Sequence, residues 1–340
     1  MPLPDNATLQ LTDDLRICRL LNGLWQVSGA HGRIDPDKAV PQMLDYHDEG
    51  FTTWDLADHY GPAEDFIGVF RRALQESGET PTPDRTQAFT KWVPRPMAMT
   101  KALVSDALNL SRRRMDTPTL DLLQFHWWDY DHPGYLDALR HMNDLKAQGV
   151  LRHVALTNFD TPHLARIQDA GVKIVSNQVQ FSIIDRRPEV AMILYCAANQ
   201  VWLLPYGVVC GGLLSEKYLG VPEPGMSALN TASLRKYKNM IDLWGGWALF
   251  QELLTVLKQI ANKHRVSISN VAVRYILDKP KVAGVIIGAR LGVSQHRAEN
   301  ARVFGFALEA DDLAQIEAIS DRANDLYRII GDCGDEYRRR

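Results

Sequence analysis

The chain lacks several sequence patterns that identify common enzyme classes. Its four cysteines are far apart among 340 residues and form no Cys-x-x-Cys pair, so no zinc knuckle or redox pair is encoded. The motifs Gly-x-Gly-x-x-Gly, His-x-His, His-Glu-x-x-His and Gly-x-Ser-x-Gly are also missing. These absences disfavour a Rossmann dehydrogenase, a metal-dependent barrel hydrolase and a serine hydrolase, and we predict no metal site.

Charge and hydropathy argue against two further kinds of partner. The 38 basic and 41 acidic residues give a net charge of -3, so no overall field attracts the chain to phosphate backbones. Arginine runs at 112–114 and 338–340 contain no aromatic residues, which indicates a solvated helix end and a frayed terminus. No stretch approaches the roughly 18 apolar residues of a membrane span. We therefore expect neither a nucleic-acid partner nor a membrane.

The start of the chain and its scattered cysteines bear on location. Residues 1–14 lack a basic segment followed by an apolar run, and free thiols are typical of a reducing compartment. We expect a cytoplasmic protein.

Short aliphatic runs alternate with helical patterns almost from end to end, which is typical of βαβ units. Two runs within residues 7–20 predict a hairpin that precedes this pattern and covers one end of it. No linker rich in Pro, Gly or Ser divides the chain, so we predict one α/β domain over residues 1–340, a (β/α)₈ TIM barrel with C-terminal helices and a long irregular section at about 207–246. The predicted strands are 21–25, 52–55, 88–91, 120–126, 150–157, 174–179, 201–205 and 282–287, and the predicted helices are 37–49, 63–75, 98–115, 133–148, 162–169, 188–199, 249–264, 269–278, 294–303 and 310–323.

In such a barrel the C-terminal strand ends share one mouth, so polar residues there are candidates for chemistry. They are Asp55, Tyr60, Lys91, His126, Thr157, Asn158, Gln178 and Tyr206. A phenol, a lysine, a carboxylate and an imidazole are the parts needed to protonate a carbonyl oxygen during reduction. We expect the ammonium of Lys91, held by Asp55, to lower the pKa of Tyr60, and His126 to donate a hydrogen bond to the substrate oxygen. None of these residues supplies hydride, which implies a cofactor.

Three segments resemble the aldo-keto reductase family. They are Trp54-Asp-Leu-Ala-Asp-His-Tyr-Gly-Pro-Ala-Glu64, Thr90-Lys-Trp92 and Leu122-Leu-Gln-Phe-His-Trp127. The resemblance implies that Tyr60 is the general acid in reduction, that Lys91 and Asp55 tune its acidity, and that His126 orients the substrate.

The resemblance extends to a site for NADPH (NADP⁺). It implies that Thr157, Asn158 and Gln178 bind the nicotinamide carboxamide, that Tyr206 stacks on the ring, and that Arg290 meets the 2′-phosphate. Further cofactor-binding positions implied by the matching segments are Lys217, Gly288, Glu299 and Asn300. Gly207 and Val208 stand where the family has Ser and Pro, which removes a hydroxyl expected near the pyrophosphate.

Tryptophans next to the catalytic strand ends are candidates for the substrate pocket, namely Trp25, Trp92, Trp127 and also Trp128. Aromatic walls suit an apolar carbonyl compound or the face of a sugar. The leading hypothesis is NADPH-dependent reduction of an aldehyde or ketone to an alcohol. Two alternatives stay open: a sugar or alcohol dehydrogenase working mainly in oxidation, and a non-catalytic NADPH-binding regulatory subunit. The physiological substrate, the product stereochemistry and the oligomeric state are not encoded in these patterns.

Overall fold

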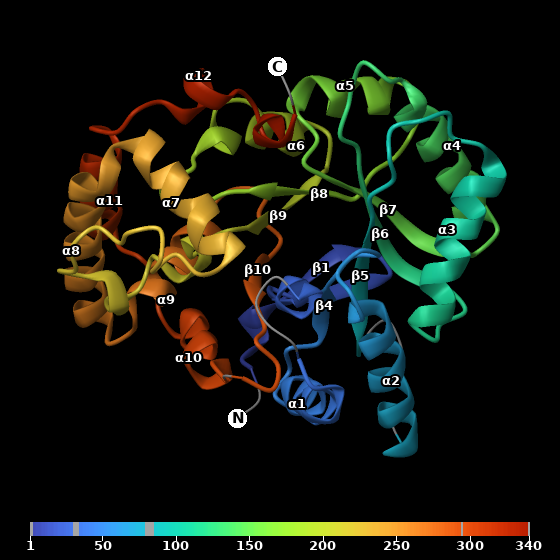
Figure 1. The fold of residues 1–340 in the computed structure, drawn as a ribbon, viewed down its shortest axis with the longest axis horizontal. Coiled ribbons are helices and arrows are strands. Elements are labelled where there is room, and N and C mark those ends of the chain that lie inside the picture. The colour runs from blue at the N-terminus through green and yellow to red at the C-terminus, as the bar shows by residue number, and fades with distance from the viewer. Residues whose placement is uncertain (1–2, 30–33, 79–84, 294, 339–340) are drawn as a thin grey trace.

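Eight parallel strands form the centre of the computed structural model, which describes residues 3–29, 34–78, 85–293 and 295–338 (Figure 1). Neighbouring strands follow chain order from β3 to β9, and β10 pairs with β3. The remaining gap is bridged where Leu203 pairs in parallel with Val282, and the Leu203 amide donates to the Lys281 carbonyl at 2.8 Å. The predicted barrel is confirmed. Its strands are β3 (Leu20–Gly23), β4 (Thr53–Asp55), β5 (Gln87–Trp92), β6 (Leu120–His126), β7 (Leu151–Thr157), β8 (Ser176–Gln180), β9 (Trp202–Tyr206) and β10 (Val285–Gly288).

An antiparallel hairpin precedes the barrel, as the sequence predicts. Its strands are β1 (Thr8–Thr12) and β2 (Leu15–Cys18), and three of its side chains, Leu11, Leu15 and Ile17, join one buried cluster with inward-facing residues of the barrel. The barrel members of that cluster are Leu21, Phe89, Leu122, Ala155, Leu204 and Ala283. The hairpin therefore closes the N-terminal end of the barrel and leaves the C-terminal end for chemistry.

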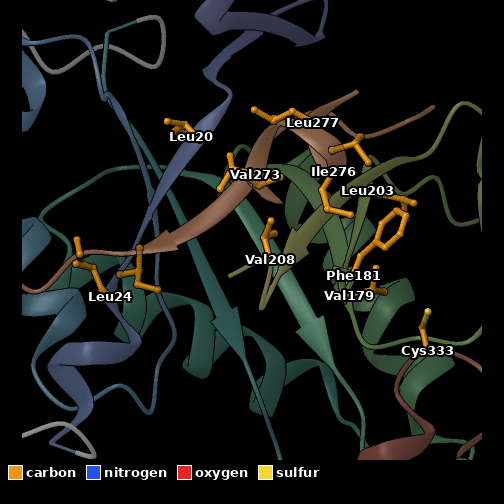
Figure 2. Packing of buried hydrophobic residues seen from close by; sticks show 14 of the residues in the cluster. Leu20, Leu24, Val179, Phe181, Leu203, Val208, Val273, Ile276, Leu277 and Cys333 are labelled. Carbon is orange, nitrogen blue, oxygen red and sulfur yellow. The ribbon is translucent and has the colours of Figure 1, made fainter. Parts of the chain in front are cut away.

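Helices surround the strands (Figure 1). Figure 2 shows how α9 supplies Val273, Ile276 and Leu277 to the buried layer that also holds Leu203 of β9 and Val179 of β8. The helices are α1 (Pro36–Asp48), α2 (Ala63–Glu76), α3 (Lys101–Arg114), α4 (Gly134–Ala147), α5 (Thr161–Asp169), α6 (Met192–Ala198), α7 (Ala232–Trp244), α8 (Gly246–His264), α9 (Ile268–Leu277), α10 (Arg297–Ala301), α11 (Ala310–Ser320) and α12 (Leu326–Ile330).

The section from 207 to 246 is more ordered than the irregular loop we predicted. It contains α7, whose first turn is capped by the Thr231 hydroxyl, which accepts a hydrogen bond from the Leu234 amide. Short 3-10 turns, η4 (Cys210–Gly212) and η5 (Glu216–Tyr218), precede it. α7 packs on η4 and on α8, so this section is part of the folded domain.

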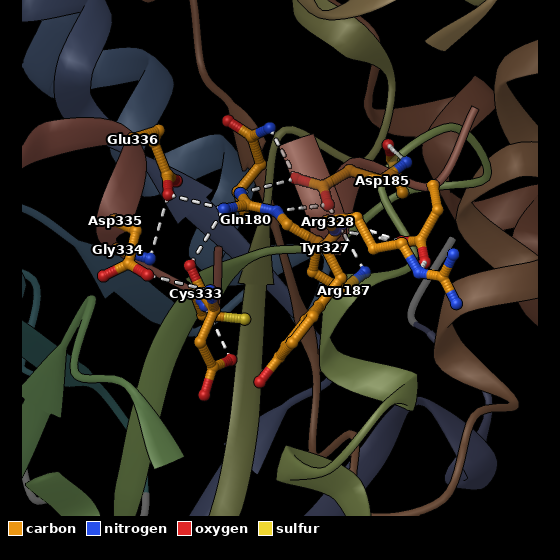
Figure 3. A network of polar contacts seen from close by, with 12 residues as sticks. Gln180, Asp185, Arg187, Tyr327, Arg328, Cys333, Gly334, Asp335 and Glu336 are labelled. Carbon is orange, nitrogen blue, oxygen red and sulfur yellow. Dashed lines mark hydrogen bonds and ion pairs between the residues drawn. The ribbon is translucent and has the colours of Figure 1, made fainter. Parts of the chain in front are cut away.

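The last described residues, 332–338, return to the barrel, and we call them the C-terminal segment. Figure 3 shows its anchor: the guanidinium of Arg187 donates to both oxygens of Asp185 at 2.8 and 2.9 Å, to the Asp332 carbonyl at 3.0 Å and to Glu336 at 2.8 Å. All of the Arg187 side chain is buried. The segment is thus held against the loop that follows β8.

Arg338 ends the described part of this segment, and the prediction of a frayed terminus is wrong for it. Its guanidinium lies 3.9 Å from the ring centroid of Tyr130 and donates to the carbonyls of Trp127 and Asn158 at 2.9 and 2.7 Å. Arg339 and Arg340 lie outside the described residues. In the described part of the chain no helix is both long and apolar enough to cross a bilayer, and all four cysteines are buried and free.

Candidate active site

Every second side chain of a strand points into the barrel, so the inward side chains form layers. A polar layer lies above the apolar layer, nearer the mouth. On β6, for example, Leu122 lies in the apolar cluster while Gln124, two residues later, donates to Asp55 at 2.8 Å. The Lys91 ammonium donates to both oxygens of Asp55 at 2.8 and 2.7 Å and to the Leu56 carbonyl at 2.9 Å. Asp55 and Lys91 are both buried, so this is a desolvated ion pair whose partners are fully hydrogen-bonded.

Tyr60 lies beside this pair, in the loop between β4 and α2. The Lys91 nitrogen is 5.2 Å from the centroid of the Tyr60 ring, and Trp25 meets the ring edge-on at 4.9 Å. Burial raises the pKa of Tyr60 well above its ordinary value, and the charges of Asp55, Tyr337 and Asp58 raise it further.

The expectation that Lys91 acidifies this phenol is therefore wrong for the protein without ligands. All three Lys91 donors face Asp55 and Leu56, so none is directed at the Tyr60 hydroxyl, and burial is the largest influence on the pKa of Tyr60. Tyr60 keeps its proton, which is the form a general acid needs.

His126 stands at the end of β6, one layer nearer the mouth. Burial lowers the pKa of His126 to about 3, assisted by the charges of Arg338, His59 and Lys91, so the imidazole is neutral. Its Nδ1 lies 3.4 Å from Asn158 Nδ2. Its Nε2 is buried and has no hydrogen-bond partner within the described ranges. A buried donor without a partner is costly in a folded protein, so this atom marks a place for a ligand.

The pairing of β6, β7 and β8 places the predicted nicotinamide-binding residues next to His126. Thr157 is the register partner of His126 on β6 and of Gln178 on β8. Its hydroxyl is buried and unpartnered among the residues that the structure describes. The side chain of Gln178 donates to Asp55 at 2.6 Å and to Gln124 at 2.8 Å, whereas its Oε1 accepts no hydrogen bond from described residues.

Asn158 and Tyr206 complete this group. Asn158 has a left-handed backbone with φ of 57°, which turns its amide back toward the mouth. The Tyr206 hydroxyl donates to Asn158 Oδ1 at 2.9 Å. The structure therefore brings together all eight predicted residues of the strand ends.

The sequence model described as the Aldo/keto reductase family matches residues 19–321. The chain belongs to this family. It is 32% identical over 178 residues to flagellar radial spoke protein 5 of Chlamydomonas reinhardtii, a match that covers 47% of this chain and only 33% of the spoke protein. It is 24% identical over 311 residues to aldo-keto reductase YhdN of Bacillus subtilis, covering 87% and 88% of the two chains. An aldo-keto reductase from Klebsiella pneumoniae, solved in complex with NADPH, superimposes with a TM-score of 0.67 at 20% identity, over 92% of this chain and 94% of that one.

Membership of the aldo/keto reductase family supports an oxidoreductase enzyme and directs attention to the rim beyond β10. Gly288 ends β10, and a side chain there would meet the Gln26 amide at 2.9 Å. Arg290 is exposed and makes no ion pair with described residues. On α10, Glu299 is exposed and Asn300 half-buried, and Lys217 is an exposed residue of η5. These residues lie at the rim, outside the buried layers.

Gly207 departs from the family pattern for a structural reason. Its φ is 74°, and a β-carbon at this position would meet the Tyr237 hydroxyl oxygen at 2.3 Å. Tyr237 of α7 therefore occupies the space where a serine side chain would stand. Glycine is required because both the backbone conformation and the approach of the ring exclude a side chain.

The tryptophan pocket is only partly as predicted. Trp25 is 37% exposed beside Tyr60, whereas Trp92 and Trp127 are buried on the outer face of the sheet against Phe125. The Trp127 indole donates to the carbonyls of Asp129 and His132, so it is a packing residue. Lys91 and His126 point into the barrel, and the residue after each points outward because strand side chains alternate.

Trp128, two residues after the end of β6, also faces the site. Its ring centroid lies 4.2 Å from that of His126, and 39% of the residue is exposed. Two further residues at the mouth were not predicted. Tyr337, from the C-terminal segment, lies 6.2 Å from His126 between ring centroids. Lys236 of α7 lies 4.6 Å from the centroid of the Tyr337 ring.

Proposed function

We propose that the protein reduces an aldehyde or ketone to an alcohol with NADPH, and that Tyr60 protonates the carbonyl oxygen. The observation that carries this proposal is the unpartnered, buried Nε2 of His126 at the mouth that also contains Tyr60 and the Lys91–Asp55 pair. A carbonyl oxygen placed there would accept a hydrogen bond from Nε2 while the phenol supplies its proton.

Each of the four catalytic residues has a separate task in this proposal. The neutral His126 donates a hydrogen bond, which orients the substrate without adding a charge to the site. Tyr60 retains its proton until the carbonyl oxygen gains negative charge. Lys91 then stabilises the phenolate that forms, and Asp55 holds Lys91 in place through both of its carboxylate oxygens.

The residues present fit a nicotinamide cofactor. The unpartnered hydroxyl of Thr157 and the carbonyl oxygen of Gln178 suit the donors and acceptors of a carboxamide. The guanidinium of Arg290, which makes no ion pair within the described ranges, suits a phosphate, and this supports NADPH over NADH. When bound, NADPH supplies the hydride that adds to the carbonyl carbon. The related reductase from Klebsiella pneumoniae that was solved with NADPH is consistent with this assignment.

The raised pKa of Tyr60 favours reduction over the alternative of a sugar or alcohol dehydrogenase. Oxidation needs the phenolate as a base, and burial disfavours that form. The alternative of a non-catalytic subunit is less well supported, because all four catalytic residue types are retained in one buried constellation. The similarity to flagellar radial spoke protein 5, whose name is not that of an enzyme, is the reason to test this alternative.

The test is isotope transfer from a labelled cofactor. The purified protein is incubated with NADPH deuterated at the transferable position of C4 and a panel of aldehydes, ketones and sugars, and the products are analysed by mass spectrometry. We expect one deuterium at the carbinol carbon of the preferred product. Tight NADPH binding without label in any product would instead identify a non-catalytic binding protein.

A further inference from the structure

A chain of side-chain hydrogen bonds runs from α7 to the catalytic imidazole. Lys236 donates to the Tyr337 hydroxyl, and that hydroxyl lies 2.9 Å from the hydroxyl of Tyr206. Tyr206 donates to Asn158 Oδ1 at 2.9 Å, and Asn158 Nδ2 lies 3.4 Å from Nδ1 of His126. Five side chains from five separate parts of the fold, namely α7, the C-terminal segment, β9, the end of β7 and β6, are therefore linked by consecutive hydrogen bonds.

We infer that Lys236 fixes which group donates and which accepts in each hydrogen bond of this chain, and that it thereby places the His126 proton on Nε2. This makes Lys236 and Tyr337 positioning residues of the catalytic site. The use of the Nε2 proton by a substrate rests on the proposed carbonyl reduction, whereas the direction of the chain does not.

The direction follows from the chemistry of an ammonium group, which has three donors and no acceptor. The Tyr337 oxygen must accept from Lys236, so its own proton is available for Tyr206, the other polar atom that it contacts. Tyr206 then accepts from Tyr337 and donates to Asn158 Oδ1. The amide nitrogen of Asn158 therefore faces His126, whose Nδ1 must be the acceptor.

The reverse direction leaves one donor without a partner among the described residues. If the Asn158 amide were turned over, its nitrogen would donate to Tyr206, and Tyr206 would donate to Tyr337. The Tyr337 oxygen would then accept from both Tyr206 and Lys236, and its own proton would lose its hydrogen bond, because the ammonium offers no lone pair to receive it. Burial raises the pKa of Tyr206 well above its ordinary value, and Tyr337 raises it further, so a phenolate does not interrupt the chain.

The aromatic rings around Lys236 hold its ammonium group beside Tyr337. Its nitrogen lies 5.0, 5.3 and 4.6 Å from the ring centroids of Tyr206, Tyr237 and Tyr337, which is within the range of cation–π attraction. No carboxylate pairs with it among the residues that the structure describes. The nearby carboxylate of Glu336 is already bonded to Arg187.

The consequence for His126 is a defined tautomer. A neutral imidazole has one donor and one acceptor nitrogen, and the hydrogen bond at one nitrogen decides the state of the other. Because Nδ1 accepts from Asn158, Nε2 carries the proton. Nε2 is buried and has no hydrogen-bond partner in the described part of the protein, so its proton is the one left for the proposed carbonyl oxygen.

The test measures the tautomer directly, without using turnover. Nitrogen-15 NMR of histidine-labelled, ligand-free protein distinguishes a protonated from an unprotonated ring nitrogen, and a His126→Gln variant identifies the signal among the ten histidines. In the wild type we expect protonation at Nε2. Lys236→Met and Tyr337→Phe each remove the directional donor and should shift the proton toward a mixture of both nitrogens.

Two conservative variants serve as matched controls. Lys236→Arg keeps a donor-only cation and should keep the wild-type tautomer. Tyr237→Phe removes a hydroxyl from the same tyrosine cluster without touching the chain, and should also keep it. Protonation of the wild type at Nδ1, or an unchanged tautomer in both Lys236→Met and Tyr337→Phe, would overturn the inference.

Turnover gives a second measurement that separates this inference from the proposed function. Only molecules with the His126 proton on Nε2 can donate to the substrate, so the rate is proportional to their fraction. An equal mixture of tautomers therefore lowers kcat/KM about twofold in Lys236→Met, and Lys236→Arg keeps the wild-type value. If the wild type reduces no carbonyl compound, the proposed function fails, while the NMR result still decides the direction of the chain.

Discussion

Replacing Arg187 with Met should destabilise the protein strongly, because this side chain joins the barrel to the C-terminal segment. Four hydrogen bonds of 2.8 to 3.0 Å surround a fully buried guanidinium. Without it, the buried carboxylate of Asp185 keeps the Gln180 amide at 2.7 Å and the backbone amide of residue 187 at 3.4 Å, both neutral donors, and Glu336 loses its ion pair. Removing one partner of a buried ion pair typically costs about 3–5 kcal/mol.

The assay is urea unfolding of Arg187→Met against Arg186→Met. Arg186 is the neighbouring residue and pairs with Glu189 at 2.7 Å, but this pair is partly exposed and should contribute less than about 1 kcal/mol. Hydrogen exchange of residues 332–338 should also be faster in Arg187→Met alone. Equal stability of the two variants, with equal exchange of this segment, would refute the reasoning.

The effect of Arg187 also depends on pH. Burial would raise the pKa of Glu336, but the charge and hydrogen bond of Arg187 outweigh burial and lower it. A depressed carboxyl pKa contributes stability above the ordinary value of 4.5, which is lost as pH falls through the folded value. The stability difference between wild type and Arg187→Met should therefore shrink as the urea series is repeated at progressively lower pH below 4.5.

Three further predictions concern the acid, the cofactor and the C-terminal segment. Because the pKa of Tyr60 lies well above 10, kcat for reduction should not fall through loss of its proton up to pH 10, whereas kcat for alcohol oxidation should rise with pH over the same range. Arg290→Ala should weaken NADPH binding about 10- to 100-fold by titration of tryptophan fluorescence, the effect of losing a charge-assisted hydrogen bond, and equal weakening of NADH would contradict its role. Gly334→Ala should release the C-terminal segment to proteolysis, because φ is 92° and the new β-carbon would lie 2.0 Å from the Asn158 carbonyl oxygen; Gly305→Ala, which meets nothing within 4 Å, is the control.

Local sequence patterns predicted the barrel and its catalytic layer because both are encoded by short segments. Asp55, Lys91 and His126 lie at or near the ends of their strands, which places them near the mouth of the barrel. The position of each residue along its strand decides whether its side chain points inward. The same alternation could have shown that Trp92 and Trp127 point outward, since each follows an inward residue.

The parts that were missed depend on distant contacts. Tyr337 meets Tyr206 across 131 positions of the chain, and no local pattern indicates that the terminus returns to the mouth. The acidity of Tyr60 was predicted in the wrong direction because a motif shows that Lys91 is near, but not where its three donors point. α7 did have a local signal, namely the Thr231 cap followed by apolar residues at helical spacing, Leu234, Tyr237 and Ile241.

The most direct test of the proposed chemistry is turnover of Tyr60→Phe with NADPH and the preferred carbonyl substrate. A positioned general acid typically contributes about 10²- to 10⁴-fold, so kcat should fall by that factor while the Kd for NADPH stays within about twofold. Turnover at the wild-type rate in this variant, with the cofactor bound normally, would show that the phenol does not supply the proton.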